Sequence, residues 1–129
     1  MIGYAMFGTN DLARSSAFYD GVMKSVGIAR LMEFPTGAIA WGVAWDKPML
    51  AIGPPYDGAP ASVGNGTMIA LVLDTRANVD TLHAAALAAG AADEGAPGVR
   101  GDDGPQAFYG AYFRDPDGNK LCAFRVGAA

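Results

Sequence analysis

Apolar residues alternate with polar or small residues in several short segments of the first half of the chain. Bounded by turn residues, these segments predict four strands, at about 2–7, 28–34, 38–45 and 49–52. Between the first two strands, apolar residues recur at spacings of three and four and predict a helix from Asp11 to about Val26. Gly27 follows as a residue type that commonly ends helices.

The same order of elements recurs after a connector rich in Pro and Gly at about 54–66. The pattern predicts a strand, a helix and three further strands, at about 67–73, 76–89, 91–99, 107–113 and 120–126. The chain is therefore predicted to be one domain, residues 1–129, with two βαβββ repeats at about 1–57 and 67–127. We expect an α+β fold in which two cupped mixed sheets surround a central cavity.

Composition excludes several classes of function. A net charge of −4 leaves no basic stripe that would neutralise phosphates, so no nucleic-acid partner is expected. No run of about 18 apolar residues is present to span a membrane. The N-terminal segment lacks the positive and then apolar pattern of a signal peptide, and a cytoplasmic location is expected. The single cysteine excludes an internal disulfide.

Three separated segments together resemble one known family. They read NDLARSSAFYDGVMKSVGI, GNGTMIALVLD and FYGAYFRDPDGNKLCAF. Their order and spacing resemble those of the vicinal oxygen chelate superfamily, which includes glyoxalases, bleomycin resistance proteins and extradiol dioxygenases. The resemblance covers nearly the whole chain. It implies the paired βαβββ fold and assembly as a homodimer.

Metal-using members of that superfamily hold an ion with His and Glu side chains on the first strand and a late strand of each repeat. The resemblance places these four positions at Tyr4, Ala51, Met68 and Cys122. Alanine has no donor atom, a neutral phenol is a weak ligand, and sulfur ligands favour soft ions. We therefore expect no bound metal and no other cofactor.

A cavity without charged ligands is expected to be apolar and to bind a small, partly aromatic organic molecule. Met6 joins Tyr4 on one side of the first strand because side chains alternate with a period of two. Tyr4 offers a phenol to a ligand, although a core tyrosine bonded to the backbone explains this residue equally well. The expected ligand-binding residues are Tyr4, Met6, Ala51, Met68, Tyr109 and Cys122.

Other reactive or aromatic side chains have plainer explanations. His83 is the only histidine and lies four residues from both Val79 and Leu87, which predicts a structural place on the apolar helix face. No motif places a histidine or an acid beside Cys122, so lining the cavity is favoured over nucleophilic catalysis. Trp41 and Trp45 are four residues apart in a predicted strand and are expected on one side of it.

Three functions remain open at this point, and no catalytic residue is assigned. A metal-free binding protein fits the expected site best. A metal-dependent lyase or dioxygenase of the glyoxalase I or extradiol type needs three or four hard ligands, which the matched positions lack. A metal-independent isomerase or proton-transfer enzyme would use Tyr4 with a carboxylate such as Glu33.

Overall fold

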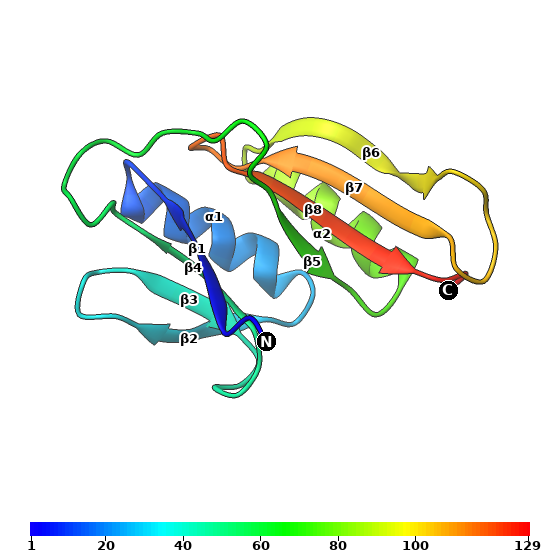
Figure 1. Ribbon diagram of the computed structural model, residues 1–129, viewed down its shortest axis with the longest axis horizontal. Helices are drawn as coiled ribbons and strands as arrows, with labels where there is room; N and C mark the ends of the chain where they lie inside the picture. Colours follow the sequence, from blue (N-terminus) through cyan, green and yellow to red (C-terminus); the bar gives the residue numbers. More distant parts are fainter.

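The computed structural model describes residues 1–129 and contains the two predicted repeats (Figure 1). The first repeat consists of β1 (Tyr4–Gly8), α1 (Leu12–Lys24), β2 (Ala29–Glu33), β3 (Ile39–Gly42) and β4 (Met49–Gly53). The second consists of β5 (Ile69–Val72), α2 (Arg76–Ala88), β6 (Ala92–Arg100), β7 (Phe108–Arg114) and β8 (Lys120–Val126). The predicted α+β class and the repeated βαβββ order are confirmed.

The two sheets have the same topology, which is the structural sign of the repeat. Their strand orders are β1-β4-β3-β2 and β5-β8-β7-β6. In each sheet the first and last strands of the repeat pair in parallel, and the remaining pairs are antiparallel. Pro97 interrupts β6 without harm because β6 is an edge strand, where one side of the backbone needs no partner.

Local sequence explains where the helices begin and end. The Asp11 side chain accepts a hydrogen bond from the Arg14 N–H, and Thr75 caps α2 in the same way. Gly27 has a φ of 77°, a conformation that glycine adopts without strain, and turns the chain from α1 towards β2.

One prediction about the third strand is wrong. β3 ends at Gly42 rather than near residue 45, so Trp41 and Trp45 do not share a strand face. Trp41 is buried in the core, and its indole N–H donates to Asp20 of α1. Trp45 lies in the turn before β4 with 68% of its surface exposed. The alternation of residues 38–45 continues into this turn, and alternation alone does not mark a strand end.

The helices cover one face of each sheet and pack against each other near the centre of the molecule (Figure 1). The core extends through both repeats as a single cluster of 17 buried residues. On α1 it includes Tyr19 and Val22, on α2 Val79 and Leu82, and on β7 Phe113. The helix-covered faces are therefore used for stability, and the opposite sheet faces stay open.

The β7–β8 turn connects the end of the chain to its beginning. The Asp117 carboxylate accepts hydrogen bonds from the Thr9 hydroxyl at 2.6 Å and from the Asn10 N–H at 3.0 Å, and pairs with Arg14. The Tyr19 hydroxyl donates to the buried Asp115 carboxylate at 2.6 Å. The sequence predicted only the strands on either side of residues 114–119, and the structure adds an attachment between the two repeats.

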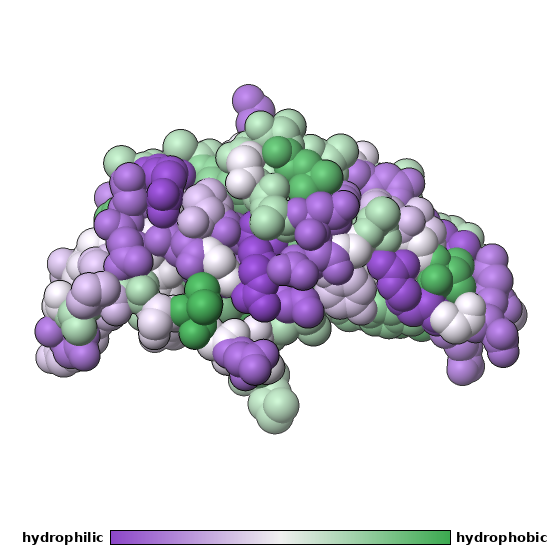
Figure 2. Space-filling view, turned by 90° about the horizontal axis from the view of Figure 1, so that it is seen from above, coloured by the Kyte–Doolittle hydropathy of each residue, from purple (hydrophilic) through white to green (hydrophobic).

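The molecule is elongated and arched, with polar and apolar side chains mixed on the face seen in Figure 2. No helix is both long and apolar enough to cross a bilayer. Because the helix-covered sheet faces are filled by the core, a ligand site is expected on the open faces.

Candidate functional site

The open face of the first sheet carries two of the predicted ligand-binding residues side by side on β1. Phe7 is buried towards α1, whereas Tyr4 and Met6 point to the other side with exposed fractions of 55% and 48%. The Tyr4 ring lies 5.8 Å from the ring of Phe34, between their centroids. A depression of about 260 Å³ is formed by Tyr4, Met6, Phe34, Pro35, Thr36 and Ala38.

Small residues form the sheet floor beside this depression. Met6 is in register with Ala51 on β4, which in turn pairs with Ala40 on β3. Both alanines are fully buried. Their methyl groups supply no hydrogen-bonding atom, and four of the six residues that form the depression are hydrophobic, so its lining is mainly apolar.

The open face of the second sheet holds Cys122, with Met68 just before β5. Cys122 on β8 is paired in register with Tyr112 on β7 and with Ala70 on β5. Met68 is 43% exposed, whereas Cys122 is 1% exposed. The structure therefore divides the predicted residues into one group on each sheet, and neither depression described for the chain has walls from both repeats.

The Cys122 thiol is not activated. Burial raises its pKa above the ordinary value, and smaller opposing effects of Tyr112, Arg100 and Lys120 do not cancel that rise. A thiol with a raised pKa is protonated at neutral pH and is a poor nucleophile. Cys122 is therefore a buried, unactivated thiol below the open face of the second sheet.

Tyr109 lies on the opposite face of the second sheet from Cys122. Its hydroxyl donates to Asp80 of α2 at 2.7 Å, and the Arg76 guanidinium lies 5.1 Å from its ring centroid. The hydrogen bond to Asp80 is the main reason why the pKa of Tyr109 is raised. Since α2 covers this face, we leave Tyr109 out of the proposed ligand site.

His83 and Glu33 are both engaged away from the open faces. His83 is buried on α2, with its Nε2 atom 3.1 Å from an Asp93 oxygen and its ring against Phe113. Glu33 pairs with Arg30, whose guanidinium makes two hydrogen bonds to Asp20 of α1. None of the residues that form the depression with Tyr4 carries a carboxylate that could share a proton-transfer step with it.

The residues at the four family metal positions do not form a cation site. Tyr4 and Ala51 lie on the first sheet and Met68 and Cys122 on the second, and Ala51 has no donor atom. No group of three or more His, Cys, Asp or Glu side chains anywhere in the chain is arranged to hold a metal ion. The donor set does not fit Zn²⁺, Ni²⁺ or Fe²⁺, because it includes no imidazole or carboxylate and only one thiol, whereas such sites use three or four donors.

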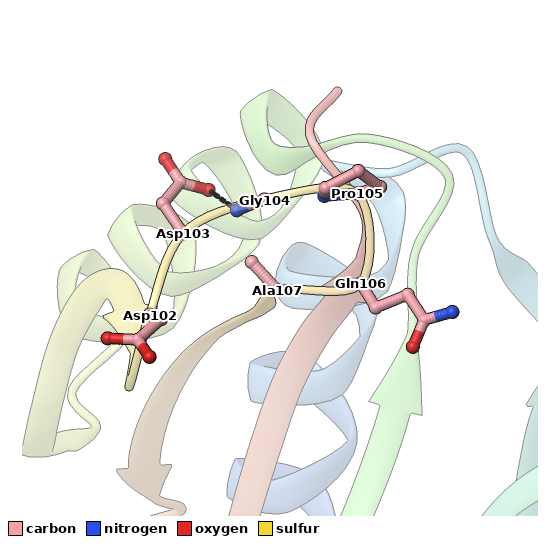
Figure 3. Close-up of a pocket in the computed structure, with 6 residues that line it drawn as sticks. All are labelled: Asp102, Asp103, Gly104, Pro105, Gln106 and Ala107. Carbon is pink, nitrogen blue, oxygen red and sulfur yellow. Dashed lines mark hydrogen bonds between the residues drawn. The ribbon is translucent and has the colours of Figure 1, made fainter.

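A second depression, of about 440 Å³, lies against the β6–β7 loop and is formed by Asp102, Asp103, Gly104, Pro105, Gln106 and Ala107. Figure 3 shows Gln106 pointing to the opposite side from the two aspartates. Asp103 is already occupied, because it accepts from Arg76 at 2.8 Å and from the Gly104 N–H at 2.8 Å. These side chains do not converge on a ligand position, so we exclude this loop from the site.

Two four-stranded sheets, each with one helix-covered face and one open face, define a class of small proteins built from paired βαβββ repeats. A family model described as the glyoxalase/bleomycin resistance protein/dioxygenase superfamily matches residues 1–123. The chain belongs to this superfamily, which agrees with the resemblance found in the sequence. A comparison with curated proteins gave no match.

Solved structures with the same fold support this assignment. A glyoxalase/bleomycin resistance protein from Albidiferax ferrireducens T118 is 34% identical with a TM-score of 0.85, covering 97% of this chain and 98% of that one. A family enzyme from Burkholderia phytofirmans PsJN is 22% identical with a TM-score of 0.69, covering 96% and 97%. A lactoylglutathione lyase from Agrobacterium tumefaciens is 22% identical with a TM-score of 0.65, covering 97% and 92%, and this likeness concerns the fold alone.

Sequence reasoning missed several residues of the open faces. Phe34 lies beside Tyr4, and Tyr112 lies across from Cys122. Arg100, one residue beyond the strand predicted at about 91–99, is the last residue of β6. The alternation of side chains along β7 and β8 could have identified Tyr112. Phe113 and Leu121 are buried and face α2, so their neighbours Tyr112 and Cys122 lie on the other face of the sheet.

Proposed function

We propose that this protein binds a small, partly aromatic organic molecule on the open faces of its sheets without using a metal ion. The observation that carries the proposal is the apolar depression around Tyr4 and Met6, at the place where metal-using relatives carry a ligand. An aromatic ring can pack against the adjoining rings of Tyr4 and Phe34, and the flexible Met6 thioether adapts to its shape. The phenol of Tyr4 is available to orient a polar atom of the ligand.

The small volume of this depression indicates that a second surface is needed to enclose a ligand. Pockets for drug-sized ligands usually measure about 300–1,000 Å³ and surround most of the ligand. The depression on the first sheet measures about 260 Å³ and is formed by one repeat. A ligand held there would remain exposed on one side unless another sheet covered it.

We propose that a homodimer supplies this second wall. β1 and β5 are edge strands, and an unpaired edge invites another strand to pair with it. Tyr4, Met6, Met68 and Val72, on or beside these edges, are each more than 40% exposed. Pairing β1 of one chain with β5 of a second chain would join the two groups of predicted ligand-binding residues into one cleft.

Sedimentation equilibrium tests the dimer. We expect twice the chain mass of 13.2 kDa, and weaker association when Val72 is replaced by lysine at the β5 edge. Val43→Lys is a matched control, since Val43 is 68% exposed and Val72 71%, but Val43 lies in the β3–β4 turn. A monomer at micromolar concentrations would contradict the dimer.

Binding is tested with N-phenyl-1-naphthylamine, an uncharged aromatic dye that fluoresces in apolar sites. We expect saturable binding, weakened at least about fivefold by Tyr4→Ser, because aromatic anchors dominate binding energies. Tyr56→Ser is the control, since Tyr56 is 97% exposed in the connector and should not affect the dye. Absence of saturable binding, or equal effects of both substitutions, would contradict the proposed site.

Elemental analysis of protein purified without chelator tests the metal-free part of the proposal. We expect far less than one Zn, Ni, Fe or Mn per chain, also after incubation with these ions. About one ion per chain would overturn the proposal and favour a metal-dependent lyase or dioxygenase.

A further inference from the structure

The open face of the second sheet carries two positive charges beside one aromatic ring. The Arg100 guanidinium lies 5.5 Å from the ring centroid of Tyr112, and the Lys120 ammonium lies 5.6 Å from the same centroid. Arg100 reaches the ring from β6, Lys120 from β8, and Tyr112 is on β7 between them. All three side chains lie on the face opposite α2, together with Cys122.

The backbone of β6 holds the arginine in this position. Arg100 donates hydrogen bonds to the carbonyl oxygens of Gly98 at 2.9 Å and Ala96 at 2.7 Å. Its side chain passes over Gly98 and Gly95, where a Cβ atom would come within 3.2 Å and 3.3 Å of the guanidinium nitrogens. The glycines of this strand therefore leave room for the Arg100 side chain. The two hydrogen bonds to the backbone hold its guanidinium in place before any ligand binds.

Neither cation has an acidic partner, although acidic residues outnumber basic ones in the chain. The ion pairs of the molecule use Arg14, Arg30, Arg76, Arg114 and His83, and none includes Arg100 or Lys120. The two carboxylates on β6, those of Asp93 and Glu94, are paired with His83 and Arg114 instead. Two cations beside one ring repel each other, and a bound anion would relieve that repulsion.

An aromatic surface adjoins the cations on the same face. Phe108 and Phe124 are stacked with centroids 5.2 Å apart and an interplanar angle of 11°. Phe124 follows Cys122 by two residues on β8, so both side chains lie on one side of the strand. The face thus offers a charged end at Arg100 and Lys120 and an apolar end at the two phenylalanines.

We propose, building on the binding function proposed above, that the ligand is an organic anion. The positive charges of Arg100 and Lys120 attract its carboxylate, sulfonate or phosphate group to this end of the face, and its aromatic part lies along the apolar surface. Guanidinium and ammonium donors make charge-assisted hydrogen bonds to such groups, and partial burial of Lys120 strengthens the attraction. The ligand class is therefore an anionic aromatic compound.

Two dyes that differ by one charged group test this inference. Anilinonaphthalene sulfonate carries a sulfonate that N-phenyl-1-naphthylamine lacks, and both report apolar sites by fluorescence. We expect the anionic dye to bind more tightly, at about one per site, and to weaken as salt is raised. Equal affinity of the two dyes in the unaltered protein would overturn the inference and leave the proposed function intact.

Charge substitutions locate the effect. Lys120→Gln and Arg100→Gln should each weaken the anionic dye about fivefold and leave the neutral dye unchanged, whereas Lys120→Arg should retain tight binding. Lys47→Gln is the matched control, because Lys47 is exposed, forms no ion pair and lies in the β3–β4 turn. An equal loss from Lys47→Gln, or no loss from either site substitution, would overturn the inference. Failure of both dyes to bind would overturn the proposed function as well.

Discussion

Replacing Tyr19 by phenylalanine tests the hydrogen bond that joins α1 to the β7–β8 turn. The Tyr19 side chain is fully buried, and its hydroxyl donates to Asp115 at 2.6 Å. Asp115 also accepts from the Asp117 N–H, from the Asn119 N–H and from the Asn119 side-chain amide. The carboxylate is 96 residues away from Tyr19 in sequence, so this bond connects the two repeats.

The structure allows the size of the effect to be worked out. Phenylalanine fills the same volume without the hydroxyl, so packing is preserved and no cavity forms. Hydrogen bonds to charged groups contribute about 1.5–3 kcal/mol, and three donors to Asp115 remain, so we expect a loss of about 2 kcal/mol. With an unfolding entropy of about 2.1 cal/mol/K per residue, this loss lowers the melting temperature by about 7 °C.

Urea denaturation followed by far-ultraviolet circular dichroism measures the change. Protein concentrations must be equal in all samples, because a dimer makes stability depend on concentration. Tyr56→Phe is the control, since Tyr56 is 97% exposed and has no hydrogen bond to lose. A loss below about 0.5 kcal/mol for Tyr19→Phe, within the usual range of surface substitutions, would refute the reasoning.

Three further predictions concern pH, a turn glycine and the thiol. Burial, and then Asp115, raises the pKa of Tyr19 above its ordinary value of 10.0, so stability should be unaffected below about pH 10 and fall above it. Tyr19→Phe should reduce this loss of stability with rising pH, as measured by denaturation curves between about pH 9 and pH 11. Gly118 has a φ of 88° and its Cβ would meet Val63, so Gly118→Ala should cost at least about 1 kcal/mol by thermal denaturation. Gly21→Ala, in an open helical position, should instead stabilise. Cys122 should react with iodoacetamide at neutral pH at least about tenfold more slowly than a cysteine peptide, as followed by mass spectrometry, and equal rates would contradict its burial.

The parts of the fold that repeat a period were predictable from the sequence. The spacing of Tyr19 and Val22 gave α1 its buried face, and the same rule placed Val79 and His83 on the buried side of α2. Period alone does not mark where a strand stops, which is why Trp45 was placed on β3. The end of β3 depends on its pairing with β4, which involves residues distant in sequence.

The candidate site was predictable only where the family resemblance supplied a position. The resemblance proposed Tyr4, Ala51 and Cys122 in this way, and the structure places Tyr4 exposed on an open sheet face and the other two buried in the sheets. Tyr112 and Tyr109 look alike in sequence, and only the register of β7 with β8 and the position of α2 separate them. Which of two neighbouring side chains faces a ligand is decided by that packing.

The attachment of the β7–β8 turn to the β1–α1 junction has a consequence for the order of folding. Thr9 and Asp117 are 108 residues apart in sequence and bond directly. During synthesis the β1–α1 junction therefore has to wait for nearly the whole chain before its final partner exists. Contacts of such long sequence separation slow folding, because the loop they close must be ordered before they form. A nascent chain that stops before Asp115 would thus lack both hydrogen bonds that join the β7–β8 turn to the first repeat.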